Sequence, residues 1–301
     1  MKQLLLTGAS GFLGWNIGHY TVNNPTEHAS NWNIIGTYLT NPTNIHSDIQ
    51  GQSLDIRNKL AIDRLFNTFQ FDGIIHTAAL SSPNHCAKSP KLSYQINVKG
   101  TEYLAKKAKE YSIPMIFTSS SQVFDGDHAP YSETDIPNPI SIYAEHKLAA
   151  ENAAFEANPN IIILRMPLMY GQANGKTANF FGEWLGKMQN NEPLFVFTDE
   201  IRTPASGQEA ATILFQLLNS NIKGELFHLG GGERLSRADF AFKMEKVFQI
   251  KNANIIPCLQ KDKIMNAKRP KDLSLSIQKL QNAINFQPKG IDAELKKMLN
   301  F

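Results

Sequence analysis

The sequence predicts an α/β fold in which one parallel sheet carries helices on both faces. Short apolar runs recur along the first half, and they are continuous rather than alternating, which is typical of parallel strands buried on both sides. Stretches of helical periodicity separate most of these runs, which indicates a doubly wound sheet of the Rossmann type. The predicted strands are residues 4–6, 33–38, 73–76, 114–117 and 161–164, and the predicted helices are residues 12–20, 92–111 and 142–154.

Composition excludes several classes of protein. The 301 residues are 42% hydrophobic and 19% charged, which is ordinary for a globular protein and rules out disorder, collagen and a disulfide miniprotein. A net charge of +3 gives little reason to expect a nucleic-acid partner. No apolar stretch approaches the roughly 18 residues of a membrane span. Cys86 and Cys258 match no metal spacing, so we expect no metal and a cytoplasmic, reducing location.

A glycine turn joins the first strand to the first helix. It reads Thr7-Gly8-Ala9-Ser10-Gly11-Phe12-Leu13-Gly14. The first glycine suits a tight turn, the second lets the backbone approach a pyrophosphate, and the third lets the helix pack closely. The helix N-terminus presents free N–H groups to phosphates. We therefore expect a dinucleotide here, contacted by Gly8, Ser10, Gly11, Phe12, Leu13 and Gly14.

The segment after the second strand bears on which dinucleotide binds. A Rossmann domain that uses NAD often has an acid there, which bonds the ribose 2′-hydroxyl. Residues 36–41 read Gly-Thr-Tyr-Leu-Thr-Asn and hold neither that acid nor a base for a 2′-phosphate. The sequence leaves NAD and NADP open, and the missing acid favours NADP.

A candidate catalytic pair follows the fourth predicted strand. Tyr143 and Lys147 are four residues apart, so on a helix they share one face. A phenol has a pKa of about 10, and a nearby ammonium lowers that pKa and so activates the phenol as an acid–base group. Tyr103 and Lys107 have the same spacing, but no serine cluster precedes them, and we interpret them as a helix-surface pair.

A serine cluster, residues 119–121, stands at the end of that strand. Ser120 is the candidate third catalytic residue, because its hydroxyl could donate to a substrate oxygen on which negative charge grows. The alternative is that these serines satisfy backbone groups of the turn, and we expect this of Ser119 or Ser121.

After about residue 165 the regular alternation weakens, and prolines at 167, 193 and 204 interrupt the chain. We expect a dinucleotide-binding domain over residues 1–165. Residues 166–301 are expected to form a smaller, mixed and mainly substrate-binding portion, and the two parts could interleave in sequence.

Several motifs together resemble the extended short-chain dehydrogenase/reductase superfamily. They are the Thr-Gly-x-x-Gly-x-x-Gly turn, Asp55-Ile56, the segment 76–79 and Asn97-Val98-Lys99-Gly100-Thr101. The resemblance implies that Asp55 and Ile56 meet the adenine and that Ala78 and Ala79 lie beside the cofactor. For Asn97 the resemblance implies a contact with the cofactor; the alternative is a buried amide that bridges two backbone segments. In this subgroup the working hydroxyl lies three residues before a Val-aromatic pair, which selects Ser120.

More specific stretches resemble the dTDP-4-dehydrorhamnose reductase family. They are Val123-Phe124-Asp125-Gly126, residues 131–139 and residues 143–148, with weaker likeness to the end of the chain. The family resemblance implies that NAD(P)H reduces the C4 ketone of a nucleotide-linked 6-deoxy sugar while Tyr143 supplies the proton. It also implies that Asn179, Phe180 and Arg202 meet the substrate. Arg202 would pair with its diphosphate, the alternative being a surface ion pair.

One departure and two alternatives remain. Members of that family typically have Thr-Asp where this chain has Ser120-Ser121, which leaves the exact sugar open, and the missing acid disfavours a dehydratase. An epimerase with retained NAD is the alternative enzyme. A non-catalytic subunit is the other, since the methionine adenosyltransferase regulatory subunit also resembles this family. We expect a small-molecule nucleotide-sugar partner, with a homodimer as one candidate assembly.

Overall fold

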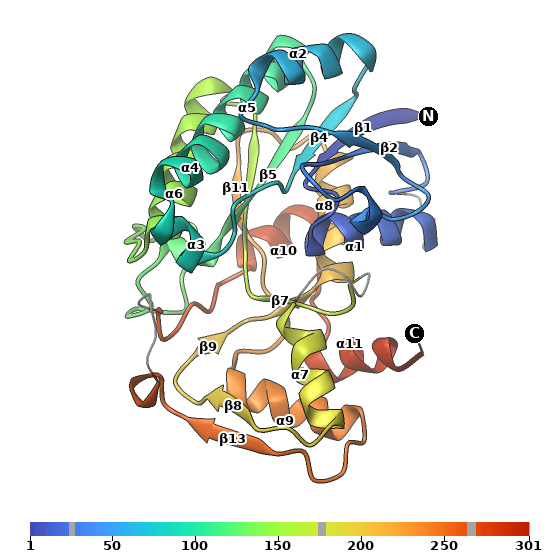
Figure 1. Cartoon of the computed structure of the whole chain (residues 1–301). Helices are drawn as coiled ribbons and strands as arrows, with labels where there is room; N and C mark the ends of the chain where they lie inside the picture. Colours follow the sequence, from blue (N-terminus) through green and yellow to red (C-terminus); the bar gives the residue numbers. More distant parts are fainter. Residues whose placement is uncertain (24–27, 174–178, 264–268, 301) are drawn as a thin grey trace.

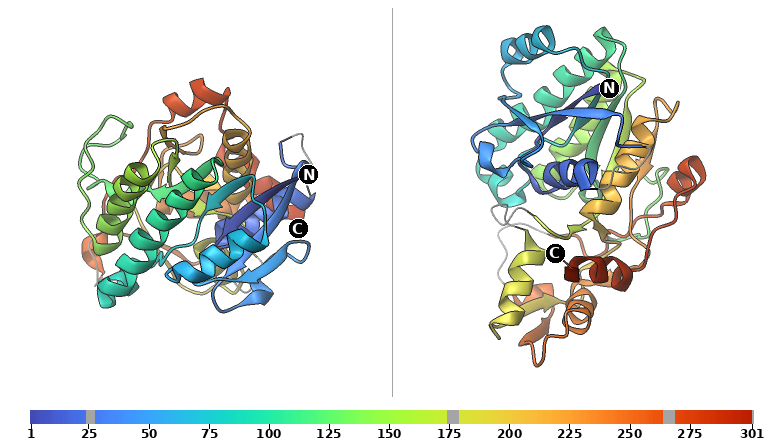
Figure 2. Two further views of the ribbon diagram at one scale, coloured as in Figure 1. Left: turned by 90° about the horizontal axis from the view of Figure 1, so that it is seen from above. Right: turned by 90° about the vertical axis from the view of Figure 1, so that its right-hand side faces the viewer.

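The computed structural model describes residues 1–23, 28–173, 179–263 and 269–300. They form two lobes, drawn one above the other in Figure 1 and separated again in the right-hand view of Figure 2. The upper lobe contains a large sheet between helices. The lower lobe contains α7, α9 and pairs of short strands.

The upper lobe is built on a seven-stranded parallel sheet in the order β11-β6-β5-β4-β1-β2-β3. The chain enters at β1, adds β2 and β3 on one side, and then adds β4, β5 and β6 on the other. The strand order therefore reverses beside β1. The doubly wound fold class is confirmed. The strands are β1 Lys2–Thr7, β2 Trp32–Tyr38, β3 Gln50–Ser53, β4 Gly73–His76, β5 Met115–Ser120, β6 Ile162–Met166 and β11 Leu226–His228.

Two of these strands were not predicted from the sequence. β3 reads Gln-Gly-Gln-Ser and lies at the sheet edge, where it pairs with β2 and needs no apolar run. β11 has three residues and pairs with β6 at the opposite edge. Both are defined by pairing with a neighbour rather than by their own composition.

The pleat of the sheet divides its apolar side chains between two cores. Leu4 and Leu6 point to the face covered by α1, Phe12–Asn23, and α8, Gly207–Leu218. Leu5 points to the opposite face, which is covered by α2, Lys59–Thr68, α5, Thr101–Glu110, and α6, Ile142–Ala157. Side chains that alternate across a strand explain why one continuous apolar run supplies both cores.

The predicted helix over residues 92–111 is divided into three parts. It consists of α4, Pro90–Tyr94, a π-helical turn, η2, over Gln95–Gly100, and α5. Such wider turns interrupt α-helices mainly at functional positions. Here the turn carries Asn97, whose carbonyl accepts a 2.6 Å hydrogen bond from the Thr101 hydroxyl.

The lower lobe has its own apolar core, which includes Tyr170, Trp184, Phe240 and Leu295. After contributing to it, the chain returns to the upper lobe at α8 and β11 and then re-enters the lower lobe at α9. The division into residues 1–165 and 166–301 stays a prediction of the sequence. The strands here are β7 Met169–Tyr170, β8 Leu194–Phe197, β9 Ile201–Arg202, β10 Ala205–Ser206, β12 Leu235–Ser236 and β13 Ile255–Cys258.

The remaining helices are short. In the part of the chain that the structure describes, no helix combines the length and the apolar character needed to cross a bilayer. The remaining helices are α3 Pro83–Lys88, α7 Phe180–Gln189, α9 Arg237–Val247, α10 Gln278–Ile284 and α11 Ile291–Lys297. The 3₁₀ turns are η1 Pro42–Asn44, η3 Ser121–Val123, η4 Gln260–Asp262 and η5 Met298–Asn300.

Candidate functional site

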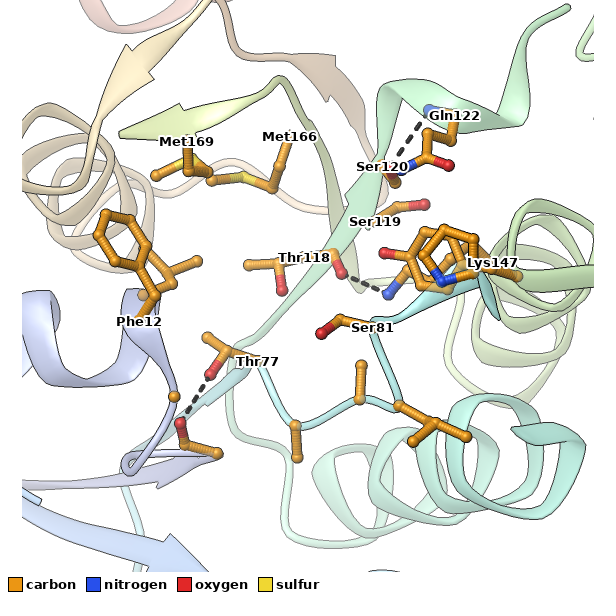
Figure 3. A pocket seen from close by; sticks show the side chains of 18 of the residues that line it. Phe12, Thr77, Ser81, Thr118, Ser119, Ser120, Gln122, Lys147, Met166 and Met169 are labelled. Carbon is orange, nitrogen blue, oxygen red and sulfur yellow. Dashed lines mark hydrogen bonds between the residues drawn. The ribbon is translucent and has the colours of Figure 1, made fainter. Parts of the chain in front are cut away.

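A cleft of about 770 Å³ opens at the carboxyl ends of β1, β4 and β5 and reaches the lower lobe. Figure 3 looks into it, with Phe12 on one side and Ser120 and Lys147 on the other. Parallel sheets bind ligands where the strand order reverses, because the carboxyl ends of diverging strands leave a crevice there. The topology therefore places the predicted dinucleotide site and the predicted catalytic residues around one cavity.

The glycine turn has the geometry that the sequence requires. Gly8 has a φ of +73°, and a Cβ there would lie 2.7 Å from Ala78 N. A Cβ on Gly14 would lie 2.2 Å from Gly8 O, so only glycine lets α1 approach the turn so closely. Ala9 N donates to Thr37 O at 2.9 Å and fastens the turn to β2. Phe12, Leu13 and Gly14 form the first turn of α1 and line the cleft, and the first N–H groups of a helix have no partner within the helix, which suits phosphate binding.

The cleft collects nearly all of the residues that the sequence assigns to the cofactor. Gly8, Ser10, Gly11, Phe12, Leu13, Gly14, Asp55, Ile56, Ala78, Ala79, Tyr143 and Lys147 all line it. The Asp55 carboxylate is already engaged, because Arg57 Nη2 donates to its Oδ2 at 2.5 Å and Arg57 Nε to its Oδ1 at 2.9 Å. These interactions hold the pKa of Asp55 below its usual value. The shape and the donor set fit a dinucleotide.

Asn97 lies behind the wall of the cleft. Its side-chain carbonyl accepts a hydrogen bond from Leu80 N at 2.8 Å, and its amide nitrogen donates to Leu80 O at 3.1 Å and to Ser93 Oγ at 3.2 Å. It therefore bridges η2 to the segment that follows β4, the second of the two arrangements considered from the sequence. A direct contact with the cofactor stays a prediction.

The three candidate catalytic side chains converge inside the cleft. Ser120 ends β5, and Tyr143 and Lys147 lie in the first turns of α6, which begins after the N-cap Ser141. Ser120 lies beside Tyr143 and acts to lower the pKa of the phenol. Lys147 Nζ donates to Thr118 O at 2.7 Å and lies 4.1 Å from the centre of the Phe117 ring (Figure 3). All three are buried.

Burial dominates the proton affinities of this pair. It raises the pKa of Tyr143 to about 12, against the lowering effect of Ser120 and with a further raising contribution from Cys86. It lowers the pKa of Lys147 to about 7, against the raising effect of Glu151. The sequence predicts that the ammonium lowers the pKa of the phenol, but in this structure burial raises that pKa, and the group that opposes the rise is Ser120. The phenol therefore stays protonated and able to donate at neutral pH.

Tertiary contacts also distinguish the serines. Ser119 donates its hydroxyl hydrogen to the buried Glu151, a residue that the sequence did not single out. Ser120 instead faces Tyr143, and its hydroxyl accepts from Gln122 N at 3.2 Å. Gln122 also lines the cleft (Figure 3). Tyr103 and Lys107, as predicted, form a cluster at the surface of the helix. The Tyr103 hydroxyl donates to Asp63 Oδ1 at 2.8 Å, and Lys107 Nζ lies 2.7 Å from the same oxygen.

The predicted substrate residues lie in the lower lobe. Phe180 and Arg202 line the cleft. Asn179 is the N-cap of α7: it accepts from Gly182 N at 2.7 Å and donates to Gly171 O at 3.2 Å. The Arg202 guanidinium is largely committed to the backbone, with Nη1 donating to Ile201 O at 2.6 Å and Nη2 to Pro270 O at 3.1 Å.

Three charged residues that the sequence reasoning missed stand beside Arg202. Glu200, Arg237 and Arg269 also line the cleft. One local signal could have revealed Arg237, because it opens α9 directly after the capping serine Ser236. A cation in the first turn opposes the helix macrodipole, and local rules are broken mainly at functional positions.

The sequence matches a family model over its whole length. The model describes the RmlD substrate binding domain and covers residues 1–301. The chain belongs to this family. The predicted membership of the extended short-chain dehydrogenase/reductases, close to the dTDP-4-dehydrorhamnose reductases, is confirmed.

Two relatives and one solved structure show how this likeness is distributed. A dTDP-4-dehydrorhamnose reductase of Aggregatibacter actinomycetemcomitans is 28% identical, with 99% of this chain and 98% of that protein aligned. The methionine adenosyltransferase 2 subunit beta of Rattus norvegicus is also 28% identical, over 93% of this chain and 82% of that protein. The structure of a dTDP-4-dehydrorhamnose reductase from Bacillus anthracis in complex with NADP superimposes with a TM-score of 0.85 at 23% identity, covering 100% and 99% of the two chains.

The expected class of enzyme, an NAD(P)-dependent oxidoreductase of the short-chain dehydrogenase/reductase type, is confirmed by the family and by its reductase members. The likeness to the NADP-bound structure shows a shared fold.

Proposed function

We propose that this protein reduces the C4 ketone of a nucleotide-linked 4-keto-6-deoxy sugar, with Tyr143 as the proton donor. The observation that carries the proposal is the convergence of Ser120, Tyr143 and Lys147 in the same cleft as the glycine turn. A ketone reductase needs a dinucleotide cradle, a proton donor and a hydrogen-bond donor for the carbonyl oxygen. The residues to which we assign these three roles line one cavity.

The chain contributes binding, orientation and the proton. When bound, the reduced nicotinamide supplies the hydride that adds to the carbonyl carbon. Tyr143 Oη gives its proton to the carbonyl oxygen, and Ser120 donates a hydrogen bond to that oxygen as its negative charge grows. The Lys147 ammonium stabilises the resulting phenolate. Apolar side chains around the cleft, such as Met166 and Phe12, exclude water from the reacting groups (Figure 3).

The substrate class rests on the relatives together with the composition of the site. Reductase relatives act, by their name, on dTDP-4-dehydrorhamnose. Beside Tyr143 the wall of this cleft presents Ser120, Ser121 and Gln122. This run offers no carboxyl group to protonate a leaving hydroxyl, which supports reduction rather than dehydration. Gln122 instead offers an amide that can donate to a sugar hydroxyl and accept from it.

We propose NADP as the preferred cofactor. Thr37 and Tyr38 end β2 and Leu39 follows it; all three line the cleft, and none carries the carboxylate that NAD-specific Rossmann domains use for the ribose. The end of β2 therefore presents no carboxylate that would repel a 2′-phosphate. Fluorescence titration is expected to give a lower Kd for NADPH than for NADH. Tighter binding of NADH would contradict this preference.

The direct test is a screen of keto-sugar nucleotides with NADPH and NADH, followed at the nicotinamide absorbance. We expect stoichiometric oxidation of NADPH with a dTDP-linked 4-keto-6-deoxy sugar. Oxidation that stops far below one equivalent, with NAD retained through purification, would favour the epimerase. Absence of oxidation with every keto sugar, despite measurable NADPH binding, would contradict reduction.

The second candidate is a non-catalytic regulatory subunit, and the methionine adenosyltransferase 2 subunit beta relatives favour it. The test is to mix the protein with a methionine adenosyltransferase and to measure the mass of the mixture and its kinetics. A stable complex with altered kinetics, and no turnover of keto sugars, would favour this role. We also propose a cytoplasmic location and a homodimeric assembly, and the mass of the isolated protein in solution tests the homodimer.

A further inference from the structure

The lower lobe carries a cluster of charged side chains where it meets the cleft. Glu200 precedes β9, Arg202 lies in it, and Arg237 opens α9 after the paired strand β12. Arg237 N donates to Glu200 O at 2.9 Å, which extends the pairing and brings these side chains together. Arg269 joins them from the last part of the chain. Three guanidinium groups thus face one carboxylate.

Aromatic faces fix the Arg237 guanidinium. Its Cζ lies 3.9 Å from the centre of the Phe180 ring and 4.2 Å from that of Trp184. Contacts of this kind attract a cation and restrict the plane of the group. Phe180, predicted to meet the substrate, here orients an arginine that lines the cleft.

Arg237 is incompletely paired despite its burial. Its Nη1 is buried without a hydrogen-bond partner among the described residues, and the same holds for Glu200 Oε2. The nearest carboxylate contact joins Arg237 Nε and Glu200 Oε1 at 3.9 Å, which is beyond hydrogen-bond distance. A buried donor left unsatisfied costs roughly 1–3 kcal/mol, and more when it is charged. Such a group suits a ligand that supplies the missing acceptor.

The neighbouring arginines are less available. Arg202 donates from both Nη atoms to backbone carbonyls and lies 3.4 Å from Glu200 Oε1. Arg269 is half exposed and lies 3.8 Å from Glu200 Oε2. Burial lowers the pKa of Arg237 to about 10, so it stays charged at neutral pH. Arg237 therefore combines a charge, a fixed plane and a free donor.

We propose that Arg237, held against the rings of Phe180 and Trp184, binds the diphosphate of the substrate. Arg269 assists it, and the Glu200 carboxylate balances the arginine charges in the absence of substrate. This inference deepens the proposed function and rests on its nucleotide-linked substrate. It transfers to Arg237 the role predicted for Arg202. A guanidinium offers two parallel N–H groups to phosphate oxygens, which an ammonium does not. Glu200 weakens binding because it repels the incoming anion.

Calorimetric titration of the full chain with dTDP tests this proposal without turnover. Saturating NADP⁺ is kept in the cell, so that the dinucleotide's own pyrophosphate does not compete, and thymidine serves as the ligand without phosphate. We expect Arg237→Met to weaken dTDP binding by about tenfold or more and to leave thymidine and NADP⁺ binding unchanged. We expect Glu200→Gln to tighten dTDP binding.

Arg234→Met is the matched control, since this arginine lies three residues upstream and donates to Asp272 and Ser274. It should bind dTDP as the wild type does. Should Arg237→Met fail to fold, Arg237→Lys decides: it keeps the charge, and we expect a several-fold loss for dTDP with thymidine unchanged. Wild-type affinity for dTDP in the folded Arg237 variant would overturn the proposal, as would an equal loss for thymidine.

The two proposals fail separately. Loss of dTDP binding in Arg237→Met, in a protein that reduces no keto sugar, would refute the reductase and keep the anion site. Keto-sugar reduction with unchanged dTDP affinity in Arg237→Met would keep the reductase and refute the anion site.

Discussion

Arg165 and Glu151 form a buried ion pair behind the candidate catalytic residues, with Arg165 Nη2 2.8 Å from Glu151 Oε2. Glu151 follows Lys147 by one turn of α6 and also accepts the Ser119 hydroxyl. Arg165 Nη1 reaches His228 Nε2 at 3.3 Å in β11. The pair therefore ties α6 to three strands of the sheet and fixes the wall on which Ser120 stands.

Breaking this ion pair should lower the free energy of unfolding of the protein. Arg165→Met leaves the Glu151 carboxylate buried without its cation, and we expect a loss of about 3–5 kcal/mol in the free energy of unfolding by urea. The double variant Arg165→Met/Glu151→Leu should lose much less, because no charge remains unpaired. Glu225→Gln, at an exposed pair with Lys279, is the control and should cost about 1 kcal/mol or less. Equal losses in the single and double variants would contradict the argument.

Tyr143→Phe should abolish most turnover and leave dinucleotide binding nearly intact. The phenol hydroxyl supplies the proton, and a general acid of this kind contributes roughly 10²–10⁴-fold to the rate. Steady-state kinetics and NADPH titration measure the two quantities. Tyr103→Phe, at the surface pair of identical spacing, should leave both unchanged. Wild-type turnover in Tyr143→Phe would remove the proposed proton donor.

Ser120→Ala and Ser119→Ala should behave differently. Ser120 lies beside Tyr143 in the cleft, and loss of one donor to a developing oxyanion costs about 10²–10³-fold in kcat. Ser119 bonds Glu151, so its removal should lower the unfolding free energy by about 1–3 kcal/mol with a much smaller effect on kcat. Kinetics and urea unfolding on both variants separate the roles. A larger kcat loss in Ser119→Ala would reverse the assignment.

The rate of reduction should fall as the pH rises through neutrality. Burial lowers the pKa of Lys147 to about 7, so the ammonium is present below that pH and is lost above it. The pKa of Tyr143, about 12, keeps the phenol protonated throughout. The measurement is a profile of kcat/KM from about pH 5 to about pH 9, which extends roughly two units to either side of the Lys147 pKa. We expect kcat/KM to fall on the alkaline side of this profile. A flat profile across neutral pH would contradict this role for Lys147.

Much of the site follows from short-range order in the sequence. The glycine turn has to join the first strand to the first helix, because the residues between them are contiguous. Tyr143 and Lys147 share a helix face because they are four residues apart. Ser120 was selected by its place at the end of a predicted strand, whereas the place of Ala78 beside the cofactor was implied by the family resemblance; both residues line the cleft.

Only the tertiary structure decided which side chains remain free to act. The Val-aromatic pair selects Ser120 among the three serines, but the sequence does not show what holds its neighbour: Glu151, 32 residues away in α6, accepts the Ser119 hydroxyl. The family resemblance implies Arg202 as the residue that meets the diphosphate, yet the backbone carbonyls of residues 270 and 271 accept its donors. Phe180 and Trp184 instead orient Arg237. Hydrogen bonding, desolvation and ring contacts depend on distances between residues remote in the chain. Local sequence patterns fix periodicity and turns but carry no information about those distances.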